Sequence, residues 1–145
     1  RALSNTPKRS LVRSAISLLL QNPSLALEVE STEGFAELRL PGVGLLIELI
    51  ALIQQRPDIS TGSLLEHYAE REELGALQKL AAQSLPGDVS AWRVEFVDAL
   101  GQLTRQTRQQ RVEELNALVR EAGMSGLTQE EKAEWLALQV SSRKG

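Results

Sequence analysis

Residues 104–111 read Thr-Arg-Gln-Thr-Arg-Gln-Gln-Arg and hold no apolar side chain over about two helical turns. Apolar residues recur at helical spacing on both sides of this segment, within residues 92–103 and again within residues 112–119. A helix that is polar on all sides commonly bridges two packed units through solvent. We therefore predict one long helix from residue 88 to about residue 122, with 104–111 as a polar helical connector.

Before the connector, short apolar helices alternate with helix-breaking signals. The sequence predicts helices that begin at Thr6-Pro7 and, as a short piece, at Asn22-Pro23, where a capping residue precedes proline. Residues 45–53 are apolar on most sides, which predicts a central core helix. Ser63 and Glu66 have the spacing of a capping box at the start of another helix. Residues 6–103 are therefore predicted to form a helical bundle subdomain.

After the connector, the sequence predicts a helical hairpin over residues 112–143. Residues 123–126 read Gly-Met-Ser-Gly and break the helix, and Thr128 with Glu131 forms a second capping-box pattern. The predicted fold class is all-α: a helical bundle subdomain joined by a long helix to a C-terminal two-helix hairpin.

The composition argues against an enzyme. The chain has 145 residues, no cysteine and one histidine, His67, so neither thiol catalysis nor a Cys- or His-based metal site is expected. His67 is interpreted as a packing or hydrogen-bonding residue. No apolar run reaches the ~18 residues that a membrane helix needs. A chain without cysteine is compatible with the reducing cytoplasm, where we expect this protein to lie. Arg1 opens the chain and its only methionine is Met124, so we expect a piece of a longer protein.

The charge distribution leaves open a nucleic-acid-binding alternative. The net charge is −3, and residues 14–104 are strongly acidic, whereas the N-terminal segment is basic. A helical domain that binds nucleic acid would use the following cations: Lys8, Arg9, Arg13, Arg105, Arg108 and Arg111. The net negative charge and an aromatic content of 3% favour little direct binding to nucleic acid.

The predicted hairpin has more apolar surface than its two helices can bury against each other. Trp135, Leu138 and Val140 are expected to be exposed, and contiguous exposed apolar surface usually marks a partner site. Alternatively, the connector bends and these residues become core. Spacing alone does not choose between the two.

Several blocks of the sequence, in order, resemble the C-terminal domain of bacterial DNA primase. The blocks are Lys8-Arg9-Ser10, residues 18–23, residues 40–45 (Leu-Pro-Gly-Val-Gly-Leu), residues 61–68, residues 77–80, residues 111–115 and residues 127–132. The resemblance covers nearly the whole chain, but residues 30–39 and 84–110 match poorly. The N-terminal domain of the replicative helicase has a similar bundle, so a helicase fragment is a further alternative, which the hairpin-like end disfavours.

The resemblance implies a non-catalytic domain that docks primase on the hexameric replicative DNA helicase. It would recruit RNA primer synthesis to the replication fork and stimulate the helicase. Zinc and magnesium would belong to upstream domains, so no cofactor is expected in this chain. The implied helicase-binding residues lie in or near the hairpin: Leu118, Leu127, Trp135, Leu138, Val140, Arg143 and Lys144. Ser141-Ser142 departs from the family pattern by interrupting the helix-favouring run at the end.

The resemblance also implies a site for the acidic C-terminal tail of single-stranded DNA-binding protein. The matching positions are Lys8, Leu11, Val12, Arg13, Ile16, Lys79 and Leu80. Cations beside an apolar groove suit a peptide that carries carboxylates and a terminal aromatic ring. Leu11, Val12 and Ile16 could equally be ordinary core residues.

Overall fold

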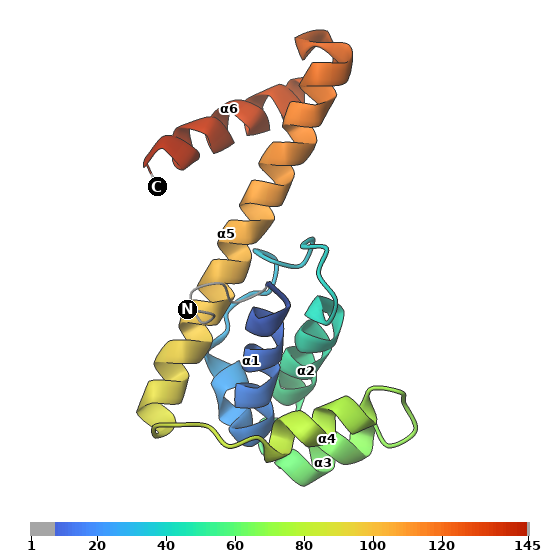
Figure 1. Cartoon of the computed structure of the whole chain (residues 1–145), viewed down its shortest axis with the longest axis vertical. Coiled ribbons are helices and arrows are strands. Elements are labelled where there is room, and N and C mark those ends of the chain that lie inside the picture. Colours follow the sequence, from blue (N-terminus) through green and yellow to red (C-terminus); the bar gives the residue numbers. More distant parts are fainter. Residues whose placement is uncertain (1–7, 145) are drawn as a thin grey trace. The chain divides into compact units, whose positions relative to one another are not determined.

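The computed structural model describes the backbone of residues 8–144 and the side chains of residues 11–140. These residues form helices and turns without a strand, as the all-α prediction required (Figure 1). The elements are α1 (Lys8–Gln21), the 3₁₀ helix η2 (Pro23–Glu28), α2 (Val43–Gln55), α3 (Thr61–His67), α4 (Leu74–Ala82), α5 (Val89–Ala122), the 3₁₀ helix η3 (Met124–Gly126) and α6 (Gln129–Lys144). Thr6-Pro7 lies outside the described residues.

The chain forms two compact units, of which the first ends at Leu103 and the second begins at Thr104. The predicted long helix is confirmed, since α5 runs unbroken through residues 104–111. The role of these residues as a connector remains a prediction.

The core of the first unit is built around α1. Residues 15–20 are all buried, because this helix lies beside α2 and also packs on η2, α3 and α4 (Figure 1). Ser17 is the one buried polar residue among them, and its hydroxyl donates a hydrogen bond to the carbonyl of Leu80 at 2.9 Å. Gln21 donates to the same carbonyl and to that of Gln83, at 3.1 and 2.7 Å. These side chains attach α1 to the C-terminal end of α4, where the Leu80 carbonyl also accepts a hydrogen bond from the Gln83 amide.

The prediction of a central apolar helix is confirmed by α2. Leu46, Leu49, Ile50 and Ile53 are at most 1% exposed. The helix begins after Gly42, whose backbone has φ of +92°, and ends before Arg56-Pro57. Proline disfavours the helical conformation of the residue that precedes it, which explains this end.

The capping predictions had mixed outcomes. The Ser63–Glu66 capping box is wrong: α3 is capped by Ser60, whose hydroxyl accepts a hydrogen bond from the Ser63 amide at 3.1 Å. Ser60 has the extended backbone that a capping residue needs, whereas Ser63 already lies inside the helix. The Asn22 side chain forms no cap, although the predicted short helix does begin at Pro23.

Tyr68, directly after α3, is a buried residue of the first unit, and its pKa is raised. It is the only tyrosine of the chain and is 1% exposed. Its hydroxyl lies 3.4 Å from Glu48 Oε1, and the guanidinium of Arg71 lies 4.9 Å from the centre of its ring. Burial, together with the negative charge of Glu48, raises the pKa of Tyr68 to about 12.

We expect alkaline pH to destabilise the chain through Tyr68. Since the pKa is about 12 in the fold and 10.0 in the unfolded chain, the stabilisation is complete below pH 10 and is lost as pH rises through 12. The free energy of unfolding, measured with urea, should fall by roughly 2 kcal/mol across this range. Tyr68→Phe should remove that part of the pH dependence. An unchanged slope in Tyr68→Phe would contradict the assignment.

Candidate docking surfaces

The second unit is a helical hairpin held by a forked ion pair. Arg111 of α5 donates from Nε to Glu134 Oε2 at 2.7 Å and from Nη2 to Glu134 Oε1 at 2.9 Å. Its Nη1 donates to Glu114 Oε1 at 3.2 Å. The hydrogen bonds from Arg111 hold the pKa of Glu134 below its usual value, and the two carboxylates raise that of Arg111. This geometry fixes which face of α6 is turned toward α5.

Trp135 lies on that same inner face of α6. Its indole Nε1 donates to Asn116 Oδ1 of α5 at 2.8 Å, and the side chain is half-buried. The loop between the helices is fixed by the predicted Thr128–Glu131 capping box, which is confirmed. The Thr128 hydroxyl accepts from the Glu131 amide at 3.0 Å, and the Glu131 carboxylate accepts from the Thr128 amide at 2.9 Å. Trp135 therefore contributes to the hairpin itself.

The opposite face of α6 is apolar and open. Leu136 is 57% exposed and Val140 is 53% exposed. With Ala133 they are spaced i, i+3 and i+7, about half a turn around the helix from Glu134 and Leu138. Figure 1 shows α6 turning back after η3 and diverging from α5 along its length. We call Ala133, Leu136 and Val140 the outer face of α6.

The predicted helicase-binding residues are divided between these faces and the interior. Val140 lies on the outer face, and Trp135 and the half-buried Leu138 lie on the inner one. Leu118 is 36% exposed on α5, whereas Leu127 is 5% exposed and belongs to the interior of the unit. The side chains of Arg143 and Lys144 lie outside those described, although α6 continues past Ser141-Ser142 to Lys144. Sequence reasoning missed Leu136, which its spacing from Val140 could have revealed.

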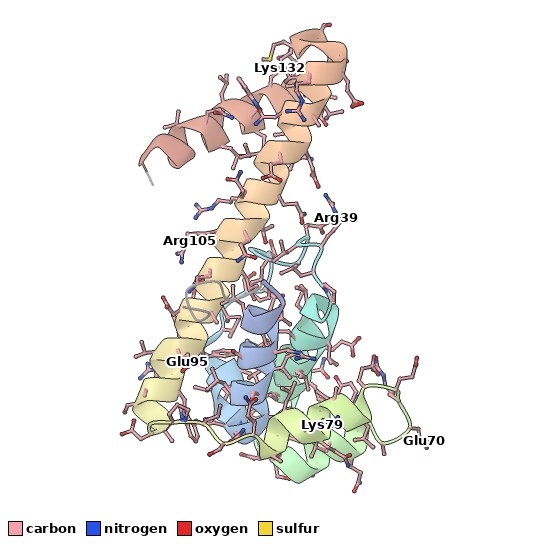
Figure 2. All side chains as sticks on the ribbon, viewed as in Figure 1. Arg39, Glu70, Lys79, Glu95, Arg105 and Lys132 are labelled. Carbon is pink, nitrogen blue, oxygen red and sulfur yellow. The ribbon has the colours of Figure 1, made fainter. Side chains whose placement is uncertain are left out.

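The positions predicted for an acidic peptide lie on α1 and α4, which pack together. Arg13 and Lys79 are exposed, and Leu11 and Leu80 are half-buried beside the core (Figure 2 labels Lys79). Val12 and Ile16 are core residues, at 1% and 3% exposure, so their side chains are not open to a peptide. Val12 lies so close to Gly42 that a Cβ added there would be 2.9 Å from Val12 Cγ1. The Lys8 side chain lies outside those described.

The cations proposed for nucleic-acid binding are divided between the two units. Arg13 belongs to the first unit, whereas Arg105, Arg108 and Arg111 belong to the second. Arg111 is engaged by two carboxylates, so it is not available to a phosphate. The side chains of Lys8 and Arg9 lie outside those described.

Neither a metal-binding cluster nor a helix able to span a membrane lies among the described residues. His67 contacts the ring of Tyr68 edge-on at 5.1 Å between centroids, and no cluster of described residues could hold a metal ion. None of the described helices combines the length and hydropathy that crossing a bilayer requires.

The fold and its open apolar surfaces define a helical protein-interaction module. Comparison with known families identifies which one. Residues 12–138 match the family described as "DNA primase DnaG DnaB-binding", and the chain belongs to this family. The family is that of a binding domain of primase and not of its catalytic part, as the sequence resemblance implied.

Relatives and a solved structure agree with this assignment. The chain is 36% identical over 138 residues to the DNA primase of Escherichia coli K12 and 34% identical over 137 residues to that of Salmonella typhimurium. Each match covers 94% of this chain and 23% of the relative, so the chain spans about a quarter of their length. The crystal structure of the DnaG primase C-terminal domain from Vibrio cholerae is similar, with a TM-score of 0.73 and 32% identity, over 90% of this chain and 92% of that one.

Proposed function

We propose that this chain docks a DNA primase on the DnaB helicase and thereby recruits primer synthesis to the replication fork and stimulates the helicase. The observation that carries the proposal is the outer face of α6, where Leu136 and Val140 are more than half exposed at helical spacing. An apolar helix face that lies open in the free protein is suited to bind another helix or a hydrophobic groove. The membership of a DnaB-binding family supports DnaB as the partner. The docking needs side chains only, without a metal or cofactor.

Introducing charge on the outer face of α6 is expected to weaken DnaB binding by at least about 30-fold. The variant is Leu136→Glu with Val140→Glu, and a central interface side chain contributes roughly 2 kcal/mol or more. Binding would be measured by calorimetry between this chain and DnaB, with circular dichroism to verify the fold. Leu27→Glu is the matched control, because Leu27 is 47% exposed in the first unit. The proposal would be contradicted if the double variant kept its full affinity for DnaB, or if Leu27→Glu lost as much affinity as the double variant.

We further propose that Arg13, Lys79, Leu11 and Leu80 bind the acidic C-terminal tail of single-stranded DNA-binding protein. Two exposed cations stand on packed helices beside half-buried leucines, an arrangement suited to carboxylates and a terminal aromatic ring. Ser17 fixes the two helices to each other through its hydrogen bond to Leu80. Because the cations are exposed, each contact should be modest and screened by salt.

Arg13→Ala or Lys79→Ala is expected to reduce binding of the tail peptide while DnaB binding stays unchanged. Each exposed charged contact contributes about 0.2–1 kcal/mol, so a loss of up to fivefold is expected at low salt. Fluorescence anisotropy of a labelled peptide at low and moderate ionic strength would measure it. Arg105→Ala is the control, since Arg105 is exposed in the second unit (Figure 2). This site would be excluded if the peptide bound equally well at both ionic strengths, or if Arg13→Ala and Lys79→Ala both kept full affinity for it.

A further inference from the structure

The helix α6 carries apolar side chains on two faces, and only one of these faces lies against α5. Trp135 and Leu138 on the inner face are half-buried, whereas Leu136 and Val140 on the outer face are more than half exposed. Turning α6 over about its own axis would exchange one apolar pair for the other. Because the hydrophobic effect is non-directional and follows the apolar area that is buried, it does not by itself select the observed rotation.

The interior of the hairpin does not select this rotation either. Among the described side chains of the second unit, Leu115 and Leu127 are the only buried apolar ones. Leu115 belongs to α5 and Leu127 precedes α6, so no described side chain of α6 is itself fully buried. Close packing of buried side chains is what gives a protein a single well-ordered arrangement. The contact between α5 and α6 therefore needs another source of specificity.

Polar contacts distinguish the two faces of α6. Arg111 of α5 donates to both carboxylate oxygens of Glu134, and Asn116 of α5 accepts from the Trp135 indole. The outer face and the neighbouring Ala137 hold no polar side chain. If that face were turned toward α5, the guanidinium and the amide would lie against apolar side chains without these partners, which is unfavourable.

The contact between Arg111 and Glu134 is of the kind that fixes an orientation. A single exposed ion pair stabilises a fold little. Here, however, two N–H donors meet two carboxylate oxygens, and the side chains are only 36% and 39% exposed. Such a fork restricts the direction of approach as well as the distance. In coiled coils, polar contacts likewise set the register of helices that apolar contacts alone leave open.

We propose that Arg111 and Asn116 are positioning residues for docking, because they hold the inner face of α6 on α5 and so keep the outer face free for DnaB. The inference rests on the proposed function only for its consequence, since the rotation of α6 is a property of the free chain. Without the two polar partners, α6 turns its outer face onto α5. The hairpin is then folded but no longer presents Leu136 and Val140.

An apolar variant tests this inference, namely Arg111→Met with Asn116→Leu, which removes both polar partners and keeps similar side-chain volumes. The chain has no cysteine, so single cysteines report exposure on each face: Ala133→Cys on the outer face and Leu138→Cys on the inner one. In the otherwise unaltered chain, alkylation should be faster in Ala133→Cys, because an exposed thiol reacts faster than a half-buried one. In the apolar variant, the ratio of the two rates should fall by at least about tenfold, and the order should reverse.

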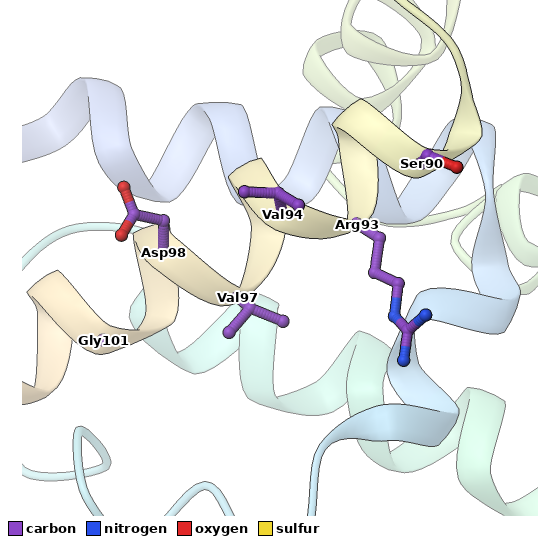
Figure 3. A pocket seen from close by; sticks show the side chains of 6 residues that line it. All are labelled: Ser90, Arg93, Val94, Val97, Asp98 and Gly101. Atoms are coloured by element: carbon purple, nitrogen blue, oxygen red, sulfur yellow. The ribbon is translucent and has the colours of Figure 1, made fainter.

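Two further variants separate the orientation of α6 from general stability. Arg111→Glu alone brings a third carboxylate beside those of Glu114 and Glu134 and should lower the same ratio. Adding Glu134→Arg restores an opposite charge between the helices and should return the ratio to within about twofold of its original value. Arg93→Gln is the matched control and should leave the ratio unchanged. Arg93 donates to Glu28 at 2.6 Å in the first unit, and Figure 3 shows its side chain extending from α5 there.

The cysteine rates and the affinity for DnaB test different statements. An unchanged ratio in the apolar variant would overturn the inference. Fast alkylation at both positions would also overturn it, because the polar contacts would then hold the hairpin together rather than select a face. With the order reversed, calorimetry should show the affinity for DnaB lowered at least about tenfold. Full affinity together with a reversed order would leave the inference standing and would contradict the proposed function of the outer face.

Discussion

Leu115→Ala is expected to unfold the second unit while the first unit stays folded. Leu115 is fully buried, and the only other buried apolar side chain among residues 104–140 is Leu127. Truncating a buried leucine costs about 2–5 kcal/mol, and a core this small has little else to offset the loss. Hydrogen exchange across residues 112–140 should become fast, whereas exchange in α2 should stay slow. The affinity for DnaB should also decrease, because the hairpin that carries the proposed docking face is no longer folded.

Leu118→Ala serves as the control for this variant. Leu118 lies one turn further along α5, but it is 36% exposed, so its truncation leaves no large cavity. Its effect on hydrogen exchange should be small. If Leu115→Ala accelerated exchange equally in α2 and in the hairpin, the two units would unfold together, and the hairpin would not be an independent element.

The helices were predictable wherever a single strong pattern decided them. Residues 45–53 are so apolar that only a central position buries them, and α2 occupies that position. The capping predictions show the limit, since the same spacing of serine or threonine and glutamate is a true capping box at Thr128 and a false one at Ser63. Three hydroxyl residues lie within residues 60–63, and the backbone conformation chooses among them. That conformation depends on packing, which spacing does not encode.

The docking surfaces were predictable only in part, because packing between residues far apart in the chain decides which helix face is exposed. Helical phase separates Leu136 and Val140 from Glu134 and Leu138, so the existence of two faces on α6 follows from the sequence. Which face meets α5 is decided by Arg111 binding Glu134 and by Asn116 accepting from Trp135. Those partners lie 23 and 19 residues apart in the chain, and periodicity does not pair them. The same holds for Val12, which packs close to Gly42 although the two lie far apart in the chain.

Gly42→Val is expected to destabilise the first unit by on the order of 4 kcal/mol. The φ of +92° at Gly42 is one that a β-branched residue rarely adopts. An added Cβ would also lie 2.9 Å from Cγ1 of Val12, which is 1% exposed and belongs to the core. Backbone strain and overpacking therefore act at one position, where the chain turns into α2. Urea unfolding of the whole chain, followed by circular dichroism, would measure the loss.

Gly44→Ala is the matched control for that variant, and it should change stability in the opposite direction. Gly44 lies two residues later, inside α2, and an added Cβ there meets nothing within 4 Å. Alanine in place of glycine at such a helical position stabilises a protein by about 0.4–1 kcal/mol, because the unfolded chain loses freedom. Opposite signs at two glycines so close together would locate the constraint at Gly42, in the turn that precedes α2 and packs against Val12. A similar, small effect of both substitutions would mean that Val12 yields and that α1 is less tightly packed than its burial indicates.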